Sequence, residues 1–251
     1  MKALLPVCTA LLLLSACTNA ETPANEAEMA QESTMAAPDA LNPSTPNLSW
    51  PGDWQFQADS PSDEMVVTAD TNIVDPDVYF TNMTPGWHVT MRQPRGIFWH
   101  PGSRGEGDYS ISSNMFLFDP GTRNEGYGLF LGGSNLADEN QEYLYFLLRR
   151  SGQFLIKLRN GAETAEVVGW TAHEAINAWT DESEGMIENL FGVQTEGDNI
   201  SFSINGQTVH SMEKGDLPSD GLVGFRMNHG VNAHISSFDV TPAWAAEAAA
   251  E

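Results

Sequence analysis

Apolar and polar residues alternate along most of the chain after residue 50, and this period of two predicts β-strands. Residues 143–148 are apolar at every position, as expected for a strand that is buried on both faces. Residues 153–159 alternate, and Ser151-Gly152 between the two segments has the composition of a tight turn. The two segments are therefore predicted to form a hairpin.

A second hairpin is predicted at 200–210, where alternating residues surround Asn205-Gly206. One stretch, 171–177, has helical character. Further strands are expected at residues 65–69, 87–91, 96–100, 108–118, 126–131, 222–228 and 231–240.

Many strands, Gly and Asn turns and no regular alternation of strands with helices indicate a sandwich or a barrel. Several of the strands are long, which favours two curved sheets over a small barrel. We therefore predict an all-β fold, a two-sheet antiparallel jelly-roll sandwich, over residues 51–241, followed by a short tail at 242–251.

The first residues follow a different pattern. Lys2 precedes a short apolar run that ends in Leu-Ser-Ala-Cys at position 17. Residues 1–16 are typical of a secretory signal and are too short for a membrane-spanning helix. Leu-Ser-Ala-Cys resembles the lipobox of bacterial lipoproteins, which implies cleavage before Cys17 and acylation of this cysteine. Each buried methylene of the acyl chains stabilises membrane binding by about 0.8 kcal/mol.

We expect a cell-envelope lipoprotein that is exported. Thr18 stands where aspartate would retain an enterobacterial lipoprotein at the inner membrane, so the outer membrane is favoured. Residues 17–50 are rich in Ala, Glu, Pro, Ser and Thr and are predicted to be a disordered acidic tether. The other cysteine, Cys8, lies in the signal, so we expect no disulfide and no cysteine-based metal site in the sandwich.

The formal net charge is −23. Nucleic-acid binding requires a basic surface, so a nucleic-acid partner is not expected. Attraction to anionic lipid by charge is equally unfavourable. Contact with a membrane is therefore expected through the lipid anchor only.

Six segments in the strand region resemble, in the same order, the concanavalin A-like lectin/glucanase superfamily. They are residues 96–101, 107–111, 126–133, 143–149, 152–157 and 170–173. Within it, the chain resembles secreted bacterial domains related to the 3-keto-disaccharide hydrolase and laminin-G-like families. The resemblance implies the jelly-roll fold, which serves lectins, hydrolases, lyases and adhesion modules alike.

Glucanases of this superfamily carry Glu-x-Asp-x-Glu on one strand, which places three carboxylates on one face. Glu182 and Glu184 have a spacing of two, but no third carboxylate completes the pattern. Their segment also lacks strand character. The laminarinase type of mechanism is therefore not predicted, and no catalytic residue is assigned.

Sugar sites combine hydrogen-bonding side chains with aromatic platforms, so we searched the polar positions opposite the apolar face of each strand. Candidate ligand-binding residues are His88, Arg92, His100, Tyr109, Arg149, Lys157, Arg159, Arg226, Asn228 and His234. Candidate platforms are Trp99, Tyr109, Tyr127 and Trp170. The alternative interpretation is that the aromatic residues are core and the polar residues face water.

Four cations, Arg149, Arg150, Lys157 and Arg159, lie within eleven residues of one hairpin. Such a cluster can bind a carboxylate or a phosphate. The alternative is pairing with nearby acids across the strands. A loop with Asp119, Asn124 and Glu125 is a candidate calcium site, because oxygen ligands suit calcium. No other cofactor is predicted.

Three functions stay open at this point. The first is binding of a glycan or sugar derivative by an envelope-anchored domain. The second is a hydrolase or lyase that acts on sugar derivatives, as in the 3-keto-disaccharide hydrolase relatives. The third is a protein-binding module for adhesion or envelope assembly.

Overall fold

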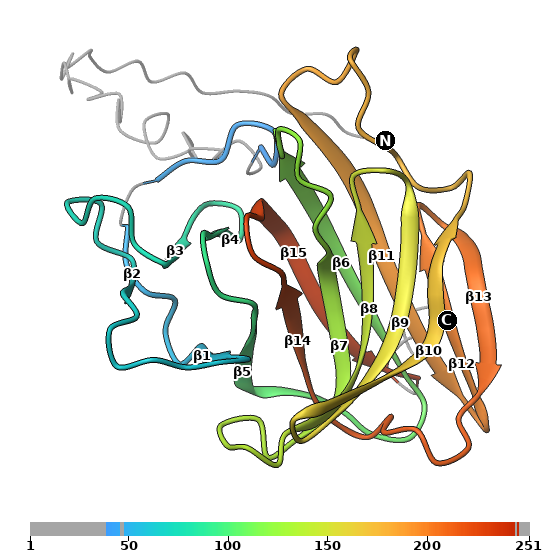
Figure 1. Ribbon diagram of the computed structural model, residues 1–251. Helices are drawn as coiled ribbons and strands as arrows, with labels where there is room; N and C mark the ends of the chain where they lie inside the picture. Colours follow the sequence, from blue (N-terminus) through green and yellow to red (C-terminus); the bar gives the residue numbers. More distant parts are fainter. Residues whose placement is uncertain (1–38, 46–47, 244, 246–251) are drawn as a thin grey trace, which may run out of the picture. The chain divides into compact units, whose positions relative to one another are not determined.

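The computed structural model describes residues 39–45, 48–243 and 245. The predicted signal, Cys17 and most of the predicted tether lie outside the described residues. Two sheets make up the described part (Figure 1). Its strands are β1 (Gln55–Ala58), β2 (Val67–Thr68), β3 (Val78–Asn82), β4 (Trp87–Met91), β5 (Gly96–Gly105), β6 (Tyr109–Phe118), β7 (Tyr127–Ser134), β8 (Glu142–Arg149), β9 (Gln153–Asn160), β10 (Glu163–Ala172), β11 (Met186–Glu196), β12 (Asn199–Ile204), β13 (Gln207–Glu213), β14 (Gly221–Met227) and β15 (Asn232–Pro242).

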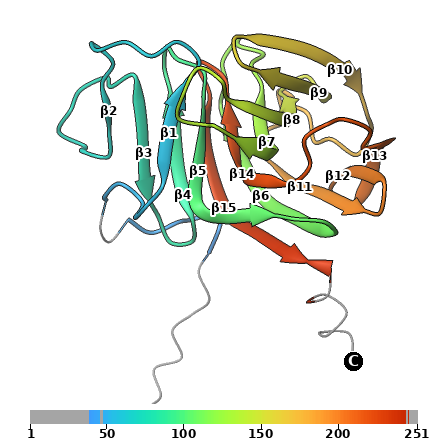
Figure 2. The same cartoon turned by 90° about the horizontal axis from the view of Figure 1, so that it is seen from below.

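The strand order is that of a two-layer sandwich. One sheet has seven strands in the order β1-β5-β14-β7-β8-β9-β10, and the other has eight in the order β13-β12-β11-β6-β15-β4-β3-β2. Pairing is antiparallel except between β2 and β3. The two sheets lie face to face (Figure 2). The predicted all-β two-sheet sandwich is confirmed.

The main core lies between the sheets and is built by the alternation that predicted the strands. Phe146 and Ile156 of the seven-stranded sheet and Phe191 and Phe202 of the eight-stranded sheet are fully buried in it. The rings of Phe146 and Phe202 are 5.1 Å apart. Burial of such side chains contributes roughly 1.5–3 kcal/mol each, which is the main source of stability in a domain without a disulfide.

Both predicted hairpins are present. Asn205 and Gly206 have φ values of 51° and 79°, as in the type I′ turn that matches the twist of the flanking strands. Gly152 has a φ of 73° in the turn between β8 and β9. Glycine adopts these angles without the steric cost that a Cβ would add.

The helical turn expected at 171–177 is wrong. Residues up to Ala172 complete strand β10, and a turn without helix follows. β11 was also not predicted, although its residues alternate between buried and exposed. Two of the buried positions, Asn189 and Thr195, are polar and hide the period. Both side chains have hydrogen-bond partners inside the sandwich. Asn189 donates to the Tyr127 hydroxyl at 3.3 Å, and Thr195 donates to the Gly107 carbonyl at 2.7 Å.

Contacts with the sandwich begin before residue 51. Ser44 and Thr84 exchange backbone hydrogen bonds, and the Trp50 ring packs against Phe80 at 5.3 Å. Within the described residues, no helix has the length and apolar character that crossing a membrane requires.

Candidate functional site

The outer face of the seven-stranded sheet is unusually rich in apolar and aromatic residues. In β8, Leu144, Phe146 and Leu148 face the main core, and the alternate side chains point outward. These outward side chains belong to a second buried cluster, which consists of Ile97, Trp99, Phe130, Leu136, Tyr143, Tyr145, Leu147 and Leu155. These side chains are at most 6% exposed, so the cluster is a second, smaller core on the outer side of the sheet. Trp170 and Leu222 are the partly buried apolar residues that pack against it.

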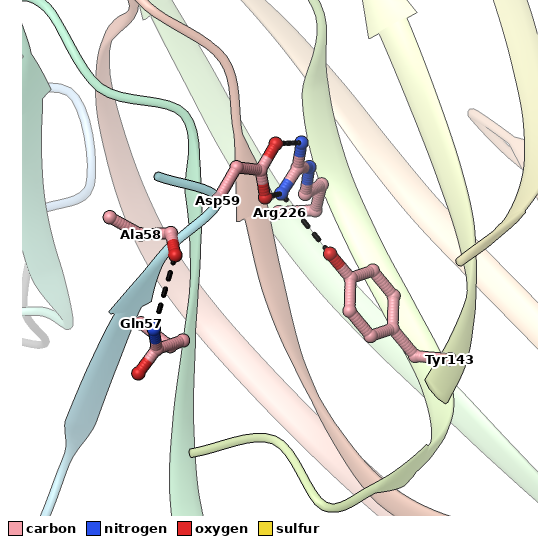
Figure 3. Close-up of polar contacts among 5 residues, drawn as sticks. All are labelled: Gln57, Ala58, Asp59, Tyr143 and Arg226. Atoms are coloured by element: carbon pink, nitrogen blue, oxygen red, sulfur yellow. Dashed lines mark hydrogen bonds and ion pairs between the residues drawn. The ribbon is translucent and has the colours of Figure 1, made fainter. Parts of the chain in front are cut away.

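A buried ion pair organises the polar groups on this face. Asp59 directly follows β1, and its carboxylate accepts two hydrogen bonds from the Arg226 guanidinium of β14, each at 2.5 Å. Arg226 Nη1 also donates to the Tyr143 hydroxyl at 3.1 Å. Figure 3 shows the guanidinium between the Asp59 carboxylate and the Tyr143 ring. The Arg226 Cζ atom lies 5.4 Å from the centroid of the Tyr145 ring, a cation–π contact.

The ion pair keeps both partners charged. Burial would raise the pKa of Asp59, but the hydrogen bonds and charge of Arg226 outweigh it and hold this pKa below its ordinary value. Burial would likewise lower the pKa of Arg226, whereas Tyr143 and Asp59 raise it. Burial raises the pKa of Tyr143 to about 12, so its hydroxyl stays protonated at neutral pH.

Two pockets adjoin this ion pair, and Asp59 lines both. The first, of about 290 Å³, lies between the end of β1, the β7–β8 loop and β9, and Gln141 and Arg159 line it. The second, of about 460 Å³, lies between the β1–β2 and β4–β5 loops, and Arg95 lines it. Ligand pockets in proteins have volumes of about 300–1,000 Å³. Each pocket is thus near the size of a small-molecule site.

An aromatic platform marks another part of the same face. Trp170 of β10 packs against the outer cluster, and the Arg149 guanidinium lies 4.3 Å from the centroid of its ring. Gln153 orients Arg149 by accepting a hydrogen bond from its Nε at 2.9 Å. Asn228 lies beside this platform and donates to Glu125 at 3.5 Å.

The structure brings five of the predicted ligand-binding residues onto this one face. They are Arg149, Lys157, Arg159, Arg226 and Asn228. The prediction that Lys157 and Arg159 point away from Phe154 and Ile156 is confirmed by the burial of the last two in the main core.

His88 and His234 do not join them. They lie opposite each other on β4 and β15, which belong to the eight-stranded sheet. The sequence analysis named them with Arg226 as candidates for ligand binding, but the structure does not bring them together with it. The reason is that β14 and β15, although consecutive in the chain, belong to different sheets. Alternation shows which side chains share a face of one strand, but it does not show which sheet the strand enters.

Two of the predicted aromatic platforms are core residues. Tyr109 and Tyr127 are buried between the sheets, and their hydroxyls bond to Ser219 O and to Asn189. They are therefore not platforms. Trp99 belongs to the outer cluster and is only 4% exposed, so it is not an exposed platform either.

Two further candidates have local structural roles. Arg92 forms an exposed ion pair with Asp75 at 2.7 Å. His100 Nδ1 accepts a hydrogen bond from the backbone N–H of Gly102 at 3.0 Å, as a turn residue does. Neither lies on the aromatic outer face.

The side chains of the candidate calcium loop form other contacts in this structure. Asp119 accepts from the N–H of Gly121, and Asn124 accepts from the N–H of Ser151. Glu125 instead pairs with His229 at 3.1 Å. Among the described residues, no group of three His, Cys, Asp or Glu side chains is close enough to hold a metal ion.

Sequence reasoning missed Asp59, Gln141 and the role of the Tyr143 hydroxyl as an acceptor for Arg226. The prediction that the segment with Tyr143 and Tyr145 is a strand buried on both faces is confirmed, because the two tyrosines are 0% and 6% exposed. Asp59 carried no signal, because its partner Arg226 lies 167 residues away in the chain.

The comparisons with known proteins agree with this architecture. No protein-family model and no curated protein sequence matches the chain. Among solved structures, the carbohydrate-binding module CBM66 from Bacillus subtilis aligns with a TM-score of 0.51 and 12% identity, over 65% of this chain and 91% of the module. The domain therefore has the concanavalin A-like lectin/glucanase fold.

A second solved structure shows the same fold. The Bacteroides ovatus mixed linkage glucan PUL GH16 protein, in complex with its G4G4G3G product, aligns with a TM-score of 0.50 and 10% identity. The alignment covers 80% of this chain and 99% of that protein. At these identities the likeness concerns the fold, and it assigns no residue of this chain a role.

Proposed function

We propose that this protein is an exported, lipid-anchored envelope protein whose sandwich binds a carbohydrate on the outer face of the seven-stranded sheet. The observation that carries the proposal is the combination, on this face, of the half-buried Trp170 ring beside Arg149 and two pockets that adjoin the buried Asp59–Arg226 pair. Aromatic rings offer platforms for sugar rings, and charged and amide groups bond to hydroxyls. The carbohydrate-binding module and the glucan-bound protein of the same fold support the choice of ligand class.

The state of Asp59 argues against a role of this residue as a general acid. General acid catalysis needs a carboxyl group with a raised pKa. Asp59 lines both pockets, and Arg226 lowers its pKa. An ionised, doubly hydrogen-bonded carboxylate is suited to a fixed binding surface and not to proton donation.

A glycan array with the purified full-length chain carrying Cys17→Ala tests the proposal, because this substitution removes the expected lipid without touching the sandwich. We expect saturable binding to one class of glycan. Trp170→Ala should weaken it at least about tenfold, since this half-buried ring is the aromatic platform that a ligand can still cover.

His88→Ala is the matched control, because this residue lies on the opposite sheet. It should leave glycan binding unchanged. Loss of binding in His88→Ala with retention in Trp170→Ala would place the site on the other face. Absence of binding to every arrayed glycan would contradict the proposal.

A further inference from the structure

Exposed apolar residues gather on the segment between β1 and β3. Seven large apolar side chains are exposed in the described part of the chain, and four of them fall within residues 66–74. These four, which we call the apolar patch, are Val66, Val67, Ile73 and Val74. Single exposed apolar residues are common on protein surfaces, whereas a group of them marks an interaction site.

Contacts with the edge of the eight-stranded sheet position the apolar patch. The patch includes part of β2, which is the last strand of this sheet (Figure 1). Val66 donates its N–H to the Asp77 carboxylate at 2.9 Å, so the two ends of the patch lie close together. Asp75 directly follows Val74 and pairs with Arg92 at 2.7 Å. The apolar side chains are thus held at the surface by contacts on both sides of them.

The surroundings of the apolar patch are strongly acidic. Residues 59–77 contain six Asp and Glu residues and no Lys or Arg. The larger of the two pockets described above adjoins the patch, since Asp77 lines it and bonds to Val66. The charged residues of this pocket are mainly carboxylates, namely Asp59, Glu64 and Asp77 against Arg95 alone. A cationic group is therefore attracted to the border of the patch, and an anionic group is repelled.

We propose that the apolar patch is a docking surface for a basic protein segment. Large apolar side chains of the partner cover the patch, and neighbouring Lys or Arg side chains pair with the carboxylates around it. Burial of the apolar side chains supplies affinity, and the opposite charges orient the encounter. A second copy of this chain would bring the same carboxylates to the contact and be repelled, as would an anionic membrane surface. The inference does not depend on carbohydrate binding, because the platform Trp170 lies on the other sheet.

Short peptides of equal length test this by fluorescence anisotropy on the full-length chain with Cys17→Ala. One peptide alternates leucine with lysine. A second has glutamate in place of lysine, and a third has serine in place of leucine. We expect the leucine–lysine peptide to bind at least about tenfold more tightly than either of the others, because it alone can cover the apolar patch and pair with the carboxylates. Its affinity should fall as ionic strength rises.

Ile73→Ser should weaken binding of the leucine–lysine peptide at least about fivefold, because it removes apolar surface from the patch. Leu190→Ser is the matched control. Leu190 is 42% exposed and Ile73 is 43% exposed, but Leu190 lies on β11, which is separated from β2 by four strands of the same sheet. The control should leave the affinity unchanged. Circular dichroism checks that both variants fold, as expected for substitutions at exposed positions.

The carboxylates are tested in the same way. Glu64→Gln should weaken binding about threefold and reduce its salt dependence, since one charge beside the patch is removed. Glu213→Gln is the control, because this exposed residue lies on β13 at the opposite edge of the sheet.

Equal binding of the three peptides, or equal effects of Ile73→Ser and Leu190→Ser, would overturn the proposal. Dimerisation of the chain that Ile73→Ser abolishes would assign the patch to a second copy, and binding to phosphatidylglycerol vesicles that Ile73→Ser abolishes would assign it to a membrane. Either result would also overturn the proposal. Trp170→Ala should leave peptide binding unchanged, so a failure here is distinguishable from a failure of the proposed carbohydrate binding.

Discussion

Arg226 is a cation on the outer face of a sheet, yet only 5% of it is exposed. Such a group is stable only when a partner compensates its lost hydration, and Asp59 supplies two hydrogen bonds. The sequence placed Arg226 correctly on a polar face of its strand. It did not indicate Asp59, because pairing across 167 residues depends on how β1 docks beside β5.

Removal of one partner of this ion pair should therefore destabilise the fold. We expect Arg226→Ala to lower the free energy of unfolding by about 3–5 kcal/mol, because it leaves the largely buried Asp59 carboxylate unpaired. Urea-induced unfolding measures the change. Arg104→Ala is the matched control and should cost less than about 1 kcal/mol, since its pair with Glu106 is exposed. Equal effects of the two substitutions would show that the buried pair is not a stability determinant.

At the scale of elements, strands and turns were predicted best where local chemistry determines them. The Asn205-Gly206 turn and the alternation of β9 are local properties and were confirmed. β11 was missed, because its inward Asn189 and Thr195 break the apolar period. These polar residues are tolerated inside only because the tertiary structure supplies hydrogen-bond partners.

Two glycines resist substitution for different reasons, one because a side chain has no space and the other because of its backbone conformation. Gly224 of β14 has no room for a side chain, because a Cβ there would lie 2.1 Å from the Phe98 carbonyl oxygen. Gly206 has open space but a φ of 79°. We expect Gly224→Ala to cost at least about 3 kcal/mol and Gly206→Ala only about 1 kcal/mol, measured by denaturant unfolding. The reverse order would contradict the packing at the β5–β14 pair.

The β4–β15 pair should make stability depend on pH. Burial, and then the charge of His88, lowers the pKa of His234 from 6.5 to about 4 in the folded protein. Its neutral form is thus favoured by folding, so the stability contribution is complete above pH 6.5 and is lost as pH falls toward 4. The loss from this group should reach about 3 kcal/mol.

Unfolding free energies at pH 7 and pH 4.5 test this prediction. His234→Phe should reduce the difference between the two values, because the ring lies beside Phe116 and neither ring nitrogen has a partner among the described residues. Asp59 contributes little to the change in this range, since its pKa is lowered below the ordinary value of 3.8 and its contribution is lost mainly at lower pH. An unchanged pH dependence in His234→Phe would assign it to other groups.

At the scale of the whole molecule, the anchor is predicted from residues 1–17, which lie outside the described residues. We expect metabolic labelling with palmitate to mark the protein, and Cys17→Ala to abolish the label and to move the protein from the membrane to the soluble fraction. Cys8→Ala is the matched control and should keep both. Membrane association that survives Cys17→Ala, without label, would contradict a lipid anchor.

The fold class follows from the sequence because a period of two and turn residues are local signals, and the signals of consecutive strands agree with each other. The same signals placed Lys157 and Arg159 on the outer side of β9, opposite the core residues. Only the tertiary structure decided which strands share a sheet. It separated His88 and His234 from Arg226, placed Tyr109 and Tyr127 in the core, and joined Asp59 to Arg226. The physical reason is that the side of a strand on which a side chain lies depends on that strand alone. A site depends on contacts between strands that are distant in the chain, and alternation contains no information on that pairing.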